Sequence, residues 1–166
     1  MAKKWTKEIF NRKSDDGIRI AEELIENIRE QDRIDVLASG ADLVFEICAC
    51  LQDCETSYVY RGENGELLCI MGKSKYIPEA VGRCIYMLGT NALLDFDYQK
   101  QLLVKEAHSV IREWVNKHGV LFNAVNSTNY KSIRWLKGLG AIFVPEGVQV
   151  DDNVFYQFII TKGSVK

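Results

Sequence analysis

Residues 120–144 read VLFNAVNSTNYKSIRWLKGLGAIFV, and this stretch decides the fold. It opens on a short, nearly continuous apolar run at 120–125, which is typical of a strand buried on both faces. The next four residues, 126–129, carry small polar side chains that can cap the free amides of a following helix. Gly140 favours a left-handed stop, because it has no side chain to clash there. The stretch therefore predicts a strand, a capped helix, a glycine stop and another strand at 141–144.

The composition is that of one globular domain covering residues 1–166. Hydrophobic residues make up 47% of the 166, which argues against disorder, and the net charge of -2 gives no reason to expect nucleic acid or an anionic membrane as partner. No apolar run is long enough to cross a bilayer, and the start lacks a secretory signal. Five cysteines without paired metal-binding spacing predict reduced structural thiols, no metal site and a cytoplasmic protein.

The rest of the chain alternates helical and strand-like patterns. Asn64-Gly65 marks a hairpin between two strand-like runs. In the second helical piece, Ile34, Leu37 and Ala38 share one face, which is its expected apolar face. The predicted elements are strands at 6–12, 57–61, 67–71, 83–88 and 154–161, and helices starting at 14–16 and spanning 31–39, 41–51 and 96–117.

This order predicts an α/β fold, or more fully an α+β fold with a mixed sheet, in a single domain. We expect about six to seven strands in a mostly antiparallel sheet, with a central parallel pair formed by 83–88 and 120–125. About four helices should flank the sheet. The loop at 145–153 should pair the last strand with 141–144.

The segment AVNSTNYKSIRWLKGLGAIF at 124–143 resembles a strand, an N-x-x-A helix and a terminal G-F of the GCN5-related N-acetyltransferase fold. Ser132 stands at the alanine of that pattern and Ala141 at its aromatic. The resemblance covers about residues 6–161. More narrowly, IYMLGTNALL at 85–94 followed by 122–143 resembles phage proteins of this fold, related to internal virion or assembly proteins of short-tailed phages.

The resemblance implies a site for acetyl-CoA. In this family the acyl-CoA lies in a V between two splayed parallel strands, here 83–88 and 120–125. Its pantetheine arm bonds to the main chain of the first strand, which gives Met87, Leu88, Gly89 and Thr90 as cofactor-binding residues. The pyrophosphate sits on the N-terminus of the following helix, where the dipole favours anions. Asn129 is a further cofactor-binding candidate, although a helix cap explains it equally well.

Two departures from the family pattern concern this site. The loop at 89–98 has one glycine and no arginine, and Asp95 and Asp97 place carboxylates where a pyrophosphate should bind. Active members often carry a tyrosine seven residues after the asparagine, as the acid for the leaving thiolate. Leu136 stands there and cannot donate a proton, while Tyr130 lies on another face.

The catalytic residues are not defined by the sequence. Glu46, Glu63 and Glu79 are all conceivable bases for an amine, and nothing local separates them; His118 and Cys84 read as structural. The sequence leaves open whether the protein is an enzyme. One hypothesis is an acetyl-CoA-dependent N-acetyltransferase with a small-molecule or protein amine as acceptor. The other is a non-catalytic scaffold in phage virion assembly or host-factor binding, placed in the host cytoplasm.

Overall fold

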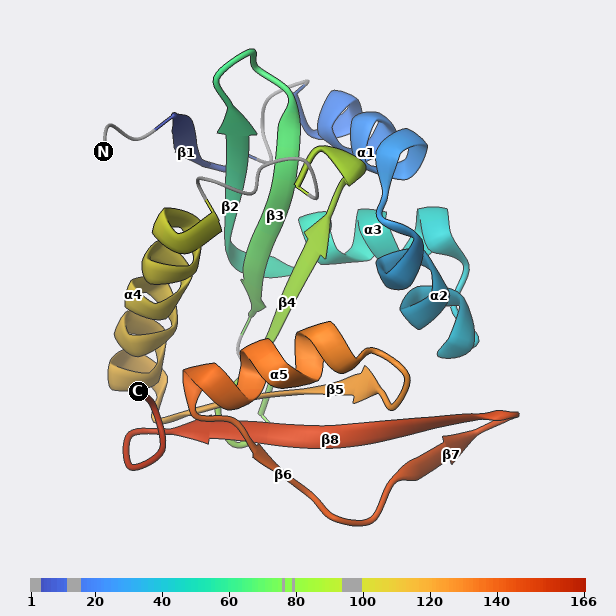
Figure 1. Ribbon diagram of the computed structural model, residues 1–166, viewed down its shortest axis with the longest axis vertical. Coiled ribbons are helices and arrows are strands. Elements are labelled where there is room, and N and C mark those ends of the chain that lie inside the picture. The colour runs from blue at the N-terminus through green and yellow to red at the C-terminus, as the bar shows by residue number, and fades with distance from the viewer. Residues whose placement is uncertain (1–3, 12–15, 76, 79, 94–99) are drawn as a thin grey trace.

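An eight-stranded mixed sheet runs through the computed structural model, which describes residues 4–11, 16–75, 77–78, 80–93 and 100–166 (Figure 1). The strand order is β1-β2-β3-β4-β5-β8-β6, and β7 pairs with β8 off this path. The strands are β1 (Trp5–Ile9), β2 (Cys54–Gly62), β3 (Leu67–Ser74), β4 (Arg83–Gly89), β5 (Val120–Asn126), β6 (Ile142–Phe143), β7 (Val148–Val150) and β8 (Asn153–Thr161).

Five α-helices cover the two faces of the sheet. Three lie on one face and enclose a core with the inward side chains of β2, β3 and β4, and two lie on the other face over the larger core. The first group is α1 (Asp16–Asn27), α2 (Glu30–Ala38) and α3 (Leu43–Gln52), and the second is α4 (Lys100–His118) and α5 (Tyr130–Leu139). The predicted α+β fold is confirmed, with one more helix than expected and with β7 in the segment expected to be a loop.

The helix at the centre of the deciding stretch forms as predicted. Asn129 is its N-cap, and the side-chain oxygen accepts a hydrogen bond from the Ser132 amide at 3.1 Å. Gly140 ends it in the left-handed region, with φ of 96°. A Cβ on Gly140 would overlap the Ser164 carbonyl, so glycine is required both by conformation and by space.

The α2 helix does not bury the face that its sequence indicated. Ile34 and Leu37 are 40% and 52% exposed, whereas Asp32 and Val36 are buried. The reason is that the Asp32 carboxylate accepts a hydrogen bond from the Gly89 amide at the end of β4, at 2.7 Å, which holds that side of α2 against the sheet. Arg29, just before the helix, neutralises the buried charge of Asp32. The prediction that Ile34, Leu37 and Ala38 form the buried face of α2 is therefore wrong.

The two central parallel strands separate soon after they meet. Pairing between β4 and β5 is limited to Arg83 with Leu121 and Cys84 with Phe122. One step further along, the Asn123 side chain donates a hydrogen bond to the Ile85 carbonyl, which fixes the point where the strands part. Beyond it both strands continue, β4 along β3 and β5 along β8, so that a V opens between them.

Candidate functional site

A cavity of about 540 Å³ fills the V between β4 and β5. Its lining comes from both cores: Tyr86, Leu88 and Val36 belong to the α2–α3 side of the sheet, while Met87 and Leu136 belong to the α4–α5 side. The cavity therefore crosses the sheet through the gap that the splayed strands leave. A volume of this size is typical of small-molecule sites.

The main chain of β4 presents alternate residues to this gap. In the antiparallel ladder with β3, Thr90 donates its N–H to the Leu68 carbonyl at 2.9 Å, so Thr90 faces β3. Hydrogen-bonded and outward-facing residues alternate along such a ladder. Leu88 therefore also faces β3, whereas Met87 and Gly89 turn their N–H and C=O groups toward the gap.

Internal partners already occupy the main chain of Gly89. Its N–H donates to the Asp32 carboxylate at 2.7 Å, and its carbonyl accepts from the Arg29 amide at 2.9 Å. Arg29 also binds Asp32 through two hydrogen bonds of 2.9 and 2.7 Å. A Cβ on Gly89 would lie 2.8 Å from the Arg29 side chain and 3.0 Å from Leu93, so this glycine is explained by packing. Of the outward-facing amides around 87–89, the one at Met87 has no partner in the described part of the chain.

Helix α2 bridges the open end of the V. Near its start, Asp32 holds Gly89 at the end of β4, and one turn later Asp35 accepts a hydrogen bond of 2.6 Å from Asn129, the cap that follows β5. Both functional groups of the Asn129 side chain are thus used, one by Asp35 and one by the amide of Ser132. The sequence indicated a cap at Asn129 but gave no sign of its partner on α2.

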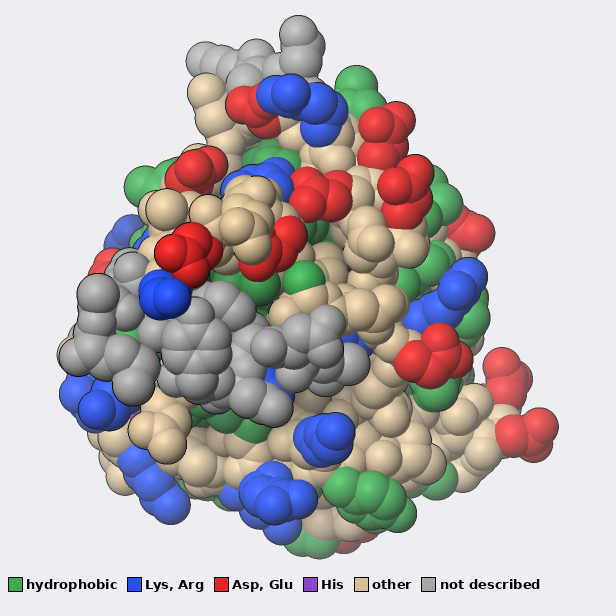
Figure 2. Space-filling view, turned by 45° about the horizontal axis from the view of Figure 1, so that its top comes forward, with side chains coloured by type: hydrophobic (Ala, Val, Ile, Leu, Met, Phe, Trp, Pro, Cys, Tyr) green, Lys and Arg blue, Asp and Glu red, His purple; other side chains and the backbone are tan. Residues whose placement is uncertain are grey.

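Charged side chains of opposite sign enter the cavity from its two sides. Asp32, Asp35 and Glu46 come from α2 and α3, whereas Lys100 and Lys131 come from the first turns of α4 and α5. Figure 2 shows a related trend at the surface, where acidic side chains predominate toward α1 and the β2–β3 hairpin and basic ones toward α5, with a separate acidic pair at the lower right. The cavity is thus polarised between a carboxylate side and a lysine side.

The protonation of Asp35 is shifted by its surroundings. Burial raises the pKa of the Asp35 carboxyl above its usual value, against hydrogen bonds from Asn129 and Gln31 that lower it. The neighbouring charge of Asp32 raises it further, and Arg29 lowers it. A carboxyl with a raised pKa binds a proton more readily, which suits a general base.

Two tyrosines and two cysteines, Cys50 and Cys69, also border the cavity. The Tyr86 hydroxyl lies 2.8 Å from the Cys50 carbonyl, to which it donates, and 3.1 Å from Ser57 Oγ. The Tyr60 hydroxyl is buried without a hydrogen-bond partner in the described part of the chain. Burial raises the pKa of the Cys50 thiol to about 12, and that of nearby Cys84 to about 11, so neither is a ready nucleophile.

The other residues named from sequence fall in different places. Leu136 is buried and lines the cavity, while Tyr130 is exposed and does not. Of the three glutamates, Glu46 lines the cavity and Glu63 forms an ion pair with Lys4 at the surface. Asp95, Asp97 and Glu79 lie outside the described residues. Residues 96–99, the expected start of the long helix, also lie outside them.

His118 belongs to a separate cluster at the far end of α4. Its Nε2 lies 2.6 Å from the buried Lys73 ammonium, which also binds Glu55 at 3.0 Å. Burial, Lys73 and Arg83 lower the pKa of His118, so the neutral ring accepts this hydrogen bond at neutral pH. The histidine is structural, as predicted, but it stabilises a buried lysine rather than only a helix end.

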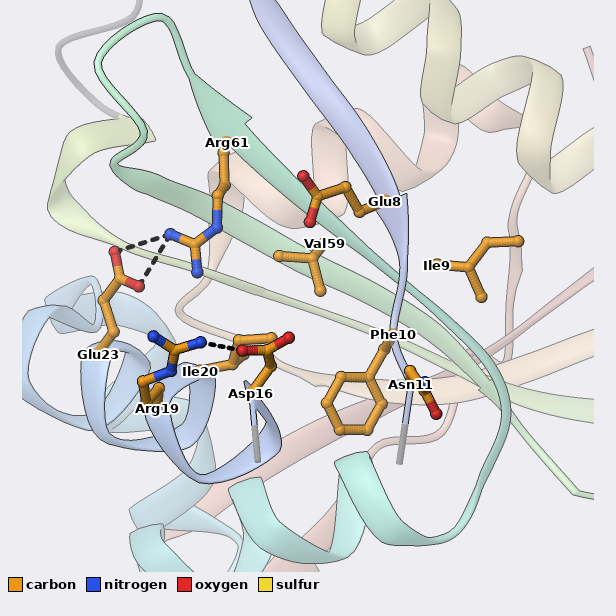
Figure 3. Close-up of a pocket in the computed structure, with 10 residues that line it drawn as sticks. All are labelled: Glu8, Ile9, Phe10, Asn11, Asp16, Arg19, Ile20, Glu23, Val59 and Arg61. Atoms are coloured by element: carbon orange, nitrogen blue, oxygen red, sulfur yellow. Dashed lines mark hydrogen bonds and ion pairs between the residues drawn. The ribbon is translucent and has the colours of Figure 1, made fainter. Parts of the chain in front are cut away.

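A second cavity, of about 480 Å³, lies between β1, β2 and α1. Figure 3 shows Arg61 and Glu23 facing each other across it, joined by an ion pair of 2.9 Å. Glu23 also accepts the amide of Leu67 at 2.9 Å, so its charge ties α1 to the sheet. Arg61 and Glu23 are thus used in holding α1 and the sheet together, and this second cavity does not border the V between β4 and β5.

Among the described residues, no group of three side chains could hold a metal ion, and all five cysteines are free thiols. No helix within these ranges is long and apolar enough to span a membrane.

Comparison by sequence finds no matching family model and no matching curated protein. Solved structures match in three dimensions. Spermidine N-acetyltransferase from Vibrio cholerae, solved with CoA and spermine, has a TM-score of 0.62 at 11% identity, covering 97% of each chain. Aminoglycoside N(6')-acetyltransferase from Legionella pneumophila has a TM-score of 0.60 at 12% identity, covering 98% of this chain and 95% of that one. A Salmonella typhimurium protein solved with its cofactor acetyl-CoA reaches 0.59 at 13%, covering 95% and 94%.

The chain therefore has the fold of the GCN5-related N-acetyltransferases, as its sequence predicted. At these identities the likeness shows the fold alone. The narrower resemblance to phage proteins receives no support from these structures and stays a prediction.

Proposed function

We propose that the protein is an acyl-CoA N-acyltransferase that moves an acetyl group from acetyl-CoA to an amine. The observation that carries the proposal is the cavity that crosses the sheet where β4 and β5 separate. It gives the donor and the acceptor a common meeting point inside the protein. The neighbours solved with CoA, spermine or acetyl-CoA have the same fold and add support.

The residues around the cavity fit an acyl-CoA in part. The outward-facing main chain of Met87 can bond to the pantetheine arm, and Lys100 and Lys131 supply positive charge for phosphates. Gly89 at the end of β4 and Thr90 directly after it take part through their positions rather than through their amides, which Asp32 and Leu68 occupy. The pyrophosphate loop lies mostly outside the described residues, so its acidic character stays a prediction from sequence.

The chemistry needs a hydrogen-bond donor where negative charge develops on the thioester oxygen. The Met87 N–H is directed into the gap beside the point where the strands part, and an amide held in place by the β3–β4 ladder is well suited to that role. We therefore place the reacting carbonyl beside Met87, with the acceptor approaching from the α2–α3 side.

Isothermal titration with acetyl-CoA tests the proposal directly. We expect micromolar binding of acetyl-CoA to the wild type. Ala124→Trp, in the cavity wall, should abolish this binding, and Glu146→Trp, at an exposed site outside the cavity lining, should keep it. Lys131→Glu should weaken binding about tenfold and flatten its dependence on salt, because it reverses a charge near the phosphates. A folded wild type that gives no heat would favour the non-catalytic scaffold.

A further inference from the structure

The three carboxylates on the α2–α3 side differ in what already binds them. Asp32 is neutralised by Arg29 and the amide of Gly89. Asp35 accepts hydrogen bonds from two neutral amides, Asn129 at 2.6 Å and Gln31 at 3.0 Å, and forms no ion pair in the described part of the chain. Glu46 is half-buried, and its hydrogen-bond donor within the same ranges is the Cys50 thiol, at 4.0 Å. Two carboxylates of the cavity lining thus have no ion-pair partner in the described part of the chain.

Carboxylates held partly out of water without a cation are unfavourable unless a ligand completes them. An independent sign that the cavity is built for a ligand is the Tyr60 hydroxyl in the same lining. It is 1% exposed and lacks a partner among the described residues, although buried hydroxyls are normally bonded. The cavity therefore has unmatched charge on its α2–α3 side, and one of its lining residues buries an unmatched hydroxyl on the α4–α5 side of the sheet.

We infer that the acceptor is a cationic amine bound by Glu46, and that Asp35 is the catalytic base that removes its proton. This inference rests on the proposed acetyl transfer and assigns the acceptor class and two residues to it. The matching charge is positive because Glu46 and Asp35 are both acidic and the third carboxylate is already neutralised.

Position and environment support Asp35 as the base. It lies on the helix that bridges the V, next to the N-cap of α5, and its raised pKa brings it closer to that of an ammonium. The charges that act on it are those of Asp32 and Arg29, which pair with each other. Glu46 on α3, Lys100 on α4 and Lys131 on α5 line the same cavity. Each of its oxygens accepts one protein hydrogen bond, which leaves a lone pair on each for the substrate.

Protons and bonds are conserved in the proposed acetyl transfer. The Asp35 carboxylate takes one proton from the ammonium and later returns it to solvent. The free amine attacks the thioester carbon, so that a C–N bond forms and the C–S bond breaks. The second nitrogen proton goes to the departing sulfur, either directly or through water, and gives the free thiol. This route needs no protein acid at position 136, where leucine stands.

Steady-state kinetics with matched acceptors and matched variants test the inference. The acceptors are 1,4-diaminobutane and 4-aminobutanoate, which share a four-carbon chain and differ in the charge at its far end. We expect kcat/KM to favour the diamine about 100-fold, because the carboxylate of the other acceptor meets Glu46. Glu46→Gln should raise KM for the diamine about tenfold with little change in kcat.

Asp35→Asn should lower kcat about 100-fold and leave KM for acetyl-CoA within about threefold. It should also remove the acidic limb of the pH–rate profile, which a structural role would not do. Asparagine keeps the hydrogen bond from Asn129, and losing a carboxylate with a raised pKa does not lower stability at neutral pH, so the variant should stay folded. Asp53→Asn, at an exposed site outside the cavity, is the control.

These experiments distinguish failure of the proposed acetyl transfer from failure of the acceptor and base assignments. A wild type that does not bind acetyl-CoA overturns the proposed function and the acceptor assignment with it. A wild type that binds acetyl-CoA but does not acetylate the diamine between pH 6 and 10, or uses both acceptors equally, overturns the assignment of a cationic acceptor alone. An Asp35→Asn variant as fast as Asp53→Asn overturns the role of Asp35.

Discussion

The hydroxyl of Tyr60 illustrates how single polar atoms mark this site. It is buried beside the cavity and has no hydrogen-bond partner in the described part of the chain, and burial raises its pKa above the ordinary value. Nearby, Tyr86 has the same chemistry but is bonded to Cys50 and Ser57. An unbonded buried hydroxyl reduces the stability of the free protein, whereas a bonded one adds to it.

We therefore predict opposite effects for two identical substitutions. Tyr60→Phe should raise the free energy of unfolding by about 1 kcal/mol, because it removes an unsatisfied group without leaving a cavity. Tyr86→Phe should lower it by about 1 kcal/mol, because it leaves the Cys50 carbonyl without its donor. Urea unfolding of both variants measures the difference. A loss of stability in Tyr60→Phe equal to that in Tyr86→Phe would show that the Tyr60 hydroxyl is already satisfied.

At the scale of elements, the boundaries of α5 were predictable and the orientation of α2 was not. The cap at Asn129 and the stop at Gly140 depend on residues within one turn of the helix end, so local sequence contains them. The buried face of α2 depends on Asp32 bonding to Gly89, which is 57 residues away in sequence. For the same reason Asp35 and Arg29 were missed, because each gains its role from a partner on another element.

Two glycines at the same end of α5, Gly138 inside the helix and Gly140 at its C-cap, should respond differently to alanine. Gly138→Ala should stabilise the protein by about 0.5 kcal/mol, because it lies inside α5 and a Cβ there has nothing within 4 Å. Gly140→Ala should destabilise it by about 2 kcal/mol or more, because φ is 96° and the Cβ would overlap the Ser164 carbonyl. Chemical unfolding measures both. Equal effects of the two substitutions would contradict the left-handed cap.

At the scale of the whole molecule, one charged cluster joins four elements below the V. Glu55 on β2 binds Lys73 on β3 at 3.0 Å and Arg83 on β4 at 2.9 Å, and His118 closes the cluster from α4. Partial burial opposes ionisation of Glu55, but hydrogen bonds from Arg83 and Lys73 outweigh it and lower the pKa to about 2. The cluster holds β4 at the end where it still pairs with β5.

Glu55→Gln should lower the free energy of unfolding at pH 7 by about 3 kcal/mol, because it leaves the Lys73 ammonium, 2% exposed, without its counter-charge. The lowered pKa means that the carboxylate stabilises the fold fully above its ordinary value of 4.5, and that this contribution is lost as the pH falls toward 2. The gap between wild type and variant should therefore narrow over that range in unfolding experiments. A constant gap would contradict the ion pair as its cause, and Asp53→Asn is the exposed control.

The cavity that crosses the sheet has a consequence for the order of events in turnover. Because its lining comes from both faces of the sheet, we expect the two reactants to approach from opposite sides and to be present together. The bordering thiols of Cys50 and Cys69 are too weakly acidic to carry the acyl group between them. Double-reciprocal plots of initial rate should therefore intersect rather than run parallel. Parallel lines would mean that the acyl group rests on the protein between two half-reactions, and that the first product departs before the second reactant arrives.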